Sequence, residues 1–155
     1  MPKTQSQGFT LIEVLLVIAI LAILAAITIM AINPAVQLAK ARDSQRSSDV
    51  HTILNAIHQY ALDNEGAFPE QIDSYALEIC RSDSPNCDFL ADLSVLTEGQ
   101  IYLVDMPRDP RCTEEGGDAY CSTNGVGYFV EMTETGRIMV SSQSAETEET
   151  IFVTR

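Results

Sequence analysis

Apolar residues fill the first part of the chain almost without interruption. From Phe9 to Ile32 the sequence reads FTLIEVLLVIAILAILAAITIMAI, 24 residues in which Glu13 is the only charged side chain. As an α-helix this run extends about 36 Å, enough to cross the roughly 30 Å hydrocarbon core of a bilayer. The pattern therefore predicts a membrane-spanning helix near the N-terminus.

A helical period with one apolar face begins after Asn33-Pro34. Between residues 35 and 62, apolar side chains recur at i, i+3, i+4, i+7 and i+11 among charged and amide residues: Val50, Ile53, Leu54, Ile57 and Ala61. This spacing predicts an amphipathic helix that buries one face. Because a proline ends or bends a helix, we expect one long helix over about residues 10–62, bent near Pro34. Gly66 suits its left-handed cap.

The C-terminal residues 126–155 alternate with a period of two, which is typical of strands. Two strand patterns flank the turn sequence at residues 133–136, and a third lies at 151–153. Residues 63–125 contain most of the prolines and read largely as loop, with a short strand or turn at 75–79 and a short helix at 89–96. The predicted fold class is α+β: a long N-terminal α-helix spine packed on a small C-terminal antiparallel β-sheet.

The charge of the chain limits its function classes. The net charge is −13, and the nine Lys and Arg residues are scattered along the sequence. Since nucleic-acid binding needs a basic face, we expect no direct nucleic-acid partner. The sequence contains no G-x-S-x-G, phosphate-cradling or H-E-x-x-H motif, so we expect no enzyme activity.

Four cysteines follow the apolar run, and none forms a C-x-x-C pair of the kind that binds zinc. In a domain delivered across a membrane they predict two disulfides. Three connectivities are possible. We favour Cys80–Cys87 with Cys112–Cys121, because each pair brackets a short polar loop.

Acidic residues crowd the loop around Cys112 and supply the oxygen ligands that calcium prefers. They are Asp105, Asp109, Glu114, Glu115 and Asp118. No D-x-D-x-D-G pattern is present, so calcium is a weak expectation and no other cofactor is expected. His51 and His58 are seven residues apart on one helix, too far apart to share a metal by themselves, and we interpret them as surface or packing residues.

Glu13 needs a partner, because a carboxylate in an apolar span costs free energy. No Lys or Arg lies between Lys3 and Lys40, so the span supplies none. A cut between Gly8 and Phe9 would create an ammonium four residues before Glu13, about one helical turn away. In a stacked assembly, the ammonium of one copy would instead meet Glu13 of the next.

The short leader with Lys3, the run Gly8-Phe9-Thr10-Leu11-Ile12-Glu13 and the long apolar segment resemble the type IV pilins and type II secretion pseudopilins. The resemblance covers about the first 35 residues closely and the rest only in layout. It implies a leader at 1–8 that is removed, a transmembrane and filament-core half-helix at 9–34, and a globular domain at 35–155. Within that domain we expect the helix at 35–62, loops at 63–125 and the sheet at 126–155.

The resemblance also implies partners and a location. In the family, a prepilin peptidase cuts after the residue that matches Gly8 and methylates the amine of the residue that matches Phe9. Phe9, Glu13 and Pro34 are then the expected assembly residues. The expected partners are further copies of the chain in a helical filament, the inner-membrane assembly platform and its ATPase. The expected location is the inner membrane, single-pass, before assembly and a cell-surface filament afterwards.

Other interpretations remain open. Within the family, they are a type II secretion pseudopilin and a minor pilin of a DNA-uptake pilus. A secretory signal peptide is a poorer fit, because its apolar region is shorter than the run in this chain and is followed by an A-x-A-like cleavage site. A plain signal anchor accounts for the apolar run but not for Glu13, and it would make the chain a single-pass anchored binding domain that never polymerises.

Overall fold

The structure is a computed structural model that describes residues 8–113, 119–147 and 150–155. The chain forms two compact units, Met1–Leu38 and Ala39–Arg155. Helix α1 (Leu11–Ile32) makes up most of the first unit. Helix α2 (Pro34–Asp63) begins in the first unit and continues into the second. The long N-terminal helix expected from the sequence is therefore present, as two consecutive helices.

The interruption lies at Asn33, one residue before the proline expected to cause it. Asn33 adopts a left-handed conformation (φ 45°, ψ 78°), and Pro34 is the first residue of α2. Proline is well suited to that position, because the first N–H groups of a helix have no partner within it. The Asn33 carbonyl accepts hydrogen bonds from the amides of Val36 (3.1 Å) and Gln37 (3.3 Å), which start α2.

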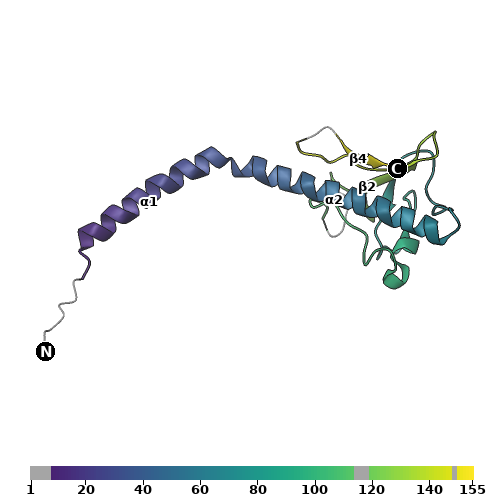
Figure 1. Ribbon diagram of the computed structural model, residues 1–155, viewed down its shortest axis with the longest axis horizontal. Coiled ribbons are helices and arrows are strands. Elements are labelled where there is room, and N and C mark those ends of the chain that lie inside the picture. The colour runs from purple at the N-terminus through teal and green to yellow at the C-terminus, as the bar shows by residue number, and fades with distance from the viewer. Residues whose placement is uncertain (1–7, 114–118, 148–149) are drawn as a thin grey trace, which may run out of the picture. The chain divides into compact units, whose positions relative to one another are not determined.

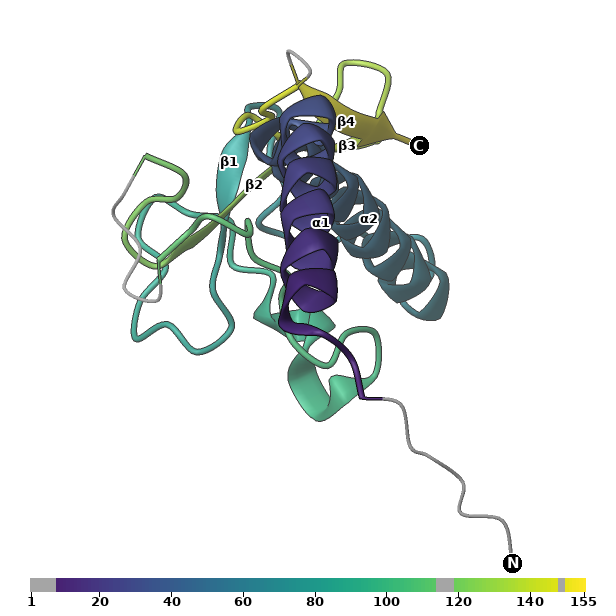
Figure 2. The same cartoon turned by 90° about the vertical axis from the view of Figure 1, so that its left-hand side faces the viewer.

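The second unit is built on a four-stranded antiparallel sheet in the order β1-β2-β3-β4. Its strands are β1 (Leu77–Cys80), β2 (Gly125–Met132), β3 (Ile138–Ser142) and β4 (Ile151–Thr154). The views in Figures 1 and 2 show the strand layer and the connecting loops along the C-terminal part of α2. The α+β class and the helix-on-sheet packing predicted from the sequence are confirmed.

The core of this unit lies between α2, the sheet and the connecting loops. All five residues of the predicted apolar stripe on α2 are buried. Val50, Ile53, Leu54 and Ile57 belong to one core cluster with residues of the sheet: Ile79, Val126, Tyr128, Val130, Ile138, Val140 and Ile151. Helix α2 ends where predicted, since Gly66 is left-handed (φ 90°) and its amide bonds to the Ala61 carbonyl at 2.7 Å.

The prediction of a short helix at residues 89–96 is wrong. Only a single 3₁₀ turn forms there, η1 (Ser94–Leu96), followed by η2 (Glu98–Gln100). Phe89 is left-handed (φ 61°), and the Asp92 carboxylate accepts a hydrogen bond from the Ser94 amide at 3.0 Å. Such local side-chain bonds compete with helix formation, so the apolar spacing alone was not decisive.

Gly127 is a position where a side chain cannot be tolerated. Its φ is +82°, and a Cβ there would lie 2.5 Å from the Tyr120 carbonyl oxygen and 2.8 Å from the Asp109 Cβ. We expect Gly127→Ala to lower the free energy of unfolding by about 2 kcal/mol more than Gly136→Ala, because overpacking adds to the backbone strain. Gly136 is the matched control, with φ +75° and open space around it. Equal losses in chemical denaturation would contradict the proposed clash.

Candidate processing and assembly site

The predicted cleavage point precedes α1 and is exposed. Gly8 has open space where a Cβ would lie, and the Phe9 side chain is 84% exposed. Thr10 is extended (φ −81°, ψ 151°) and is the last residue before the helix. Since proteases act on exposed, non-helical backbone, the Gly8–Phe9 bond lies where a peptidase can reach it.

Thr10 sets the start of the helix, a role the sequence analysis missed. The Thr10 hydroxyl accepts a hydrogen bond from the Glu13 amide at 3.3 Å, which satisfies one of the unpaired N–H groups of the first turn. The signal was present, because Thr10 and Glu13 have the spacing of a capping box before an apolar run. Because the helix begins after Thr10, Gly8 and Phe9 lie outside it.

Glu13 lies in the first turn of α1, where a carboxylate is favoured by the helix dipole. Its side chain lines the same shallow hollow as Phe9, together with Val14, Val17 and Ile18. Within the described residues Glu13 makes no ion pair. Phe9 and Glu13 therefore border the same hollow at the start of α1.

Helix α1 has no buried residue. It is the one helix in the described part of the chain that is long and apolar enough to span a membrane. The side chains of α1 are apolar on every face of the helix. A helix of this kind is stable only where all its faces contact an apolar environment.

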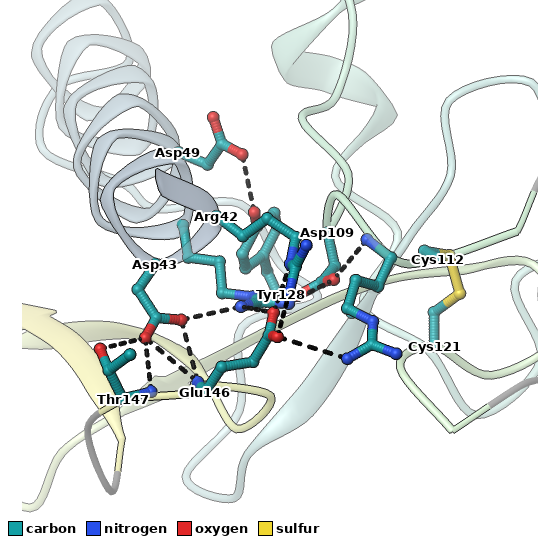
Figure 3. A network of polar contacts seen from close by, with 12 residues as sticks. Arg42, Asp43, Asp49, Asp109, Cys112, Cys121, Tyr128, Glu146 and Thr147 are labelled. Atoms are coloured by element: carbon teal, nitrogen blue, oxygen red, sulfur yellow. Dashed lines mark hydrogen bonds and ion pairs between the residues drawn. A yellow bond between two sulfur atoms is a disulfide. The ribbon is translucent and has the colours of Figure 1, made fainter. Parts of the chain in front are cut away.

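A second polar cluster, which includes Asp43, Asp109 and Glu146, lies in the second unit (Figure 3). Arg46, which bonds to all three, is completely buried. The Arg46 guanidinium donates to both carboxylate oxygens of Asp109, at 2.6 and 3.0 Å. It also donates to Asp43 at 2.8 Å and Glu146 at 3.0 Å. Arg42 and Arg111 add further ion pairs to Glu146. Burial lowers the pKa of Arg46, but these hydrogen bonds outweigh it and raise that pKa overall.

The same cluster fastens the segment after β3 to helix α2. Asp43 accepts hydrogen bonds from the amides of Glu146 and Thr147 and from the Thr147 hydroxyl (2.6 Å). Six residues further along α2, Asp49 accepts a hydrogen bond from the Tyr128 hydroxyl at 2.7 Å. Burial raises the pKa of Asp49, despite that hydrogen bond. The cluster is thus a structural joint between α2, the loops and the sheet.

Asp43 and Glu146 make this joint sensitive to acid. Burial raises the pKa of Asp43, but hydrogen bonds from Thr147, Glu146 and Arg46 lower it to about 2. The bond from Arg42 is the main cause that lowers the pKa of Glu146 to about 2. Carboxylates with lowered pKa stabilise the fold above their ordinary pKa, and that contribution is lost as pH falls toward the folded value.

We therefore expect the free energy of unfolding to fall between about pH 4.5 and 2, by about 2 kcal/mol for Asp43 alone. The raised pKa of Asp49 acts in the opposite sense, so its protonation offsets part of the loss. Denaturant unfolding of the full chain in detergent micelles, followed by tyrosine fluorescence from pH 7 to 2, measures the slope. Asp43→Asn, already uncharged at neutral pH, should flatten it. An unchanged slope would contradict the role of Asp43.

Both disulfides join the local pairs favoured from the sequence, Cys80–Cys87 and Cys112–Cys121. Among the calcium candidates, Asp109 is engaged by Arg46, and Asp105 accepts a hydrogen bond from the Met106 amide at 2.8 Å. The other candidates, Glu114, Glu115 and Asp118, lie outside the described residues. Calcium binding by this loop remains a prediction.

Comparison with known proteins adds one match. The family model described as the prokaryotic N-terminal methylation motif matches residues 3–29, the segment that contains the cleavage point, Thr10 and Glu13. No curated protein and no solved structure gives a significant match. The match therefore supports a class III signal peptide of the type IV pilin and pseudopilin type in the N-terminal segment.

Proposed function

We propose that the chain is the structural subunit of a type IV pilus-like filament. A prepilin peptidase cuts after Gly8 and methylates the amine of Phe9, and the mature subunits polymerise through α1. The observation that supports this most is the combination of a matched methylation motif with a helix that has no buried residue and carries Glu13 in its first turn.

The assembly route follows from the distribution of charge and apolar surface. Before cleavage, α1 spans the inner membrane with Lys3 on the cytoplasmic side, by the positive-inside bias. An assembly platform and its ATPase then move the subunit into the filament, where the α1 helices of many copies surround one another. The second unit, with its disulfides and acidic surface, faces the medium, as expected for adhesion or motility filaments.

The choice between filament and simple anchor depends on Glu13 and Phe9. A membrane anchor needs only an apolar helix. A carboxylate in that helix raises the free energy of insertion, and a simple anchor has no interaction that offsets this cost. In a filament, the new ammonium of one copy and Glu13 of the next offset each other's cost in apolar surroundings. This pairing would explain why the apolar helix carries a carboxylate and why cleavage, which creates the ammonium, precedes assembly.

Mass spectrometry and electron microscopy of material sheared from cells test the proposal. We expect a chain that begins at methylated Phe9 and is the main component of thin filaments. A chain that begins at Phe9 but stays in the envelope would replace this proposal with a pseudopilin or minor pilin. An uncut chain in the membrane would refute processing and favour the anchored binding domain. Gly8→Leu, in a position with open space around it, serves as the uncleaved control.

A further inference from the structure

Phe89 is the most exposed large apolar side chain of the second unit, with 97% of its surface accessible. Its backbone is left-handed (φ 61°), a conformation that bulky residues rarely adopt and that costs free energy. The fold therefore bears a cost to present an aromatic ring to solvent, which is the reverse of what folding alone favours.

The chain on both sides of Phe89 is fixed. The Cys80–Cys87 disulfide ties the preceding residues to β1, and the Leu90 amide bonds to the Cys87 carbonyl at 3.0 Å. On the other side, the Ala91 amide donates to the Glu78 carbonyl at 2.8 Å, and the Cys80 amide donates to the Ala91 carbonyl at 2.9 Å. A ring presented from a fixed backbone loses little further freedom on binding.

The same unit has a hollow of about 450 Å³ at the C-terminal end of α2 that suits an aromatic ring. It is lined by His58, Ala61, Leu62, Glu65, Gly66, Phe68 and Arg155. Leu62 is 77% exposed there, and the His58 and Phe68 rings meet edge-to-face with centroids 5.7 Å apart. A third ring would add aromatic contacts of the kind that dominate interface energies.

The charges around the ring and the hollow are compatible. Asp88, next to Phe89, is exposed, while the hollow has one cation, Arg155, beside one anion, Glu65. The Arg155 guanidinium bonds only to the Asn55 amide oxygen, at 3.3 Å, among the described residues. In a chain of net charge −13, this cation gives the acidic Asp88–Phe89 segment a place where another copy does not simply repel it.

We infer that Phe89 of one copy docks in the α2-end hollow of a second copy, with Asp88 beside Arg155. This inference rests on the proposed filament function and names one contact within it. Because ring and hollow are different surface patches, the contact is heterologous and repeats from copy to copy without closing. That is the kind of contact a filament of identical subunits requires.

Cross-linking in filaments tests the contact with Phe89→Cys and Leu62→Cys and a short bismaleimide, which adds irreversibly to thiols and leaves the native disulfides intact. Both positions are exposed, so the substitutions are expected to be tolerated. Filaments with both substitutions in every copy should give a ladder of oligomers on a denaturing gel. Filaments that mix the two single variants should give dimers, and either single variant alone should give none.

Ile101→Cys, 72% exposed, replaces Phe89→Cys in the control and should not cross-link to Leu62→Cys. Separately, Phe89→Ser should reduce filament yield while processed subunit persists, and Ile101→Ser should not. Intact filaments without the ladder, an equal ladder with Ile101→Cys, cross-linking by Phe89→Cys alone, or full yield with Phe89→Ser would overturn the inference. The absence of filaments from the unsubstituted chain would instead overturn the proposed function.

Discussion

Replacing Arg46 by methionine is expected to lower the free energy of unfolding by about 3–5 kcal/mol, because it leaves buried carboxylates without their counter-charge. Arg46 is completely buried and bonds to Asp43, Asp109 and Glu146. Glu146 retains Arg42 and Arg111 in the variant. Asp109, whose carboxylate has no other ion pair among the described residues, is the most affected. Denaturant unfolding of the full chain in detergent micelles measures the loss.

Arg137→Met is the matched control, since Arg137 is exposed and makes no side-chain ion pair in the described structure. It should change the free energy of unfolding by less than about 0.5 kcal/mol. The double variant Arg46→Met with Asp109→Asn should recover part of the loss, because the stranded charge is removed while the Arg111 amide keeps its acceptor. Strictly additive losses would show that the two residues are not coupled.

Short-range patterns account for what the sequence predicted well. The α2 stripe from Val50 to Ala61 and the turn at residues 133–136 each depend on neighbours a few positions away. The hairpin turn is closed by a hydrogen bond from the Thr133 amide to the Arg137 carbonyl at 2.8 Å. Period and turn chemistry alone therefore placed the helix on the sheet, and the methylation motif is likewise a local pattern.

Long-range pairing accounts for what was missed. Arg46 is a polar residue in a polar stretch of α2, and its partners Asp109 and Glu146 are 63 and 100 residues away. No local period marks such a residue as core, so Asp109 was predicted only as a weak calcium candidate, and its ion pair with Arg46 was not predicted. Thr10 is different, because the Thr10-x-x-Glu13 spacing is a local capping-box pattern from which its role as N-cap could have been predicted.

Replacing Glu13 by glutamine is expected to abolish assembly while leaving cleavage intact. The amide keeps the shape of the side chain and, without a charge, lowers the cost of membrane insertion. In the proposed filament, however, the ammonium at Phe9 would lose its counter-charge in apolar surroundings. An uncompensated charge of this kind costs about 3–5 kcal/mol. Each subunit addition would then be weakened by at least about 100-fold.

Filament yield and the N-terminal mass of the membrane-held subunit separate the two effects. Glu13→Gln should give a chain that begins at Phe9 and no filaments. Glu134→Gln, which removes a charge from the exposed hairpin turn, should assemble normally. Glu13→Asp keeps the charge on a shorter side chain, so it should assemble better than Glu13→Gln. Filaments from Glu13→Gln at the normal yield would show that the carboxylate is not an assembly group, and the purpose of a charge in α1 would have to lie elsewhere.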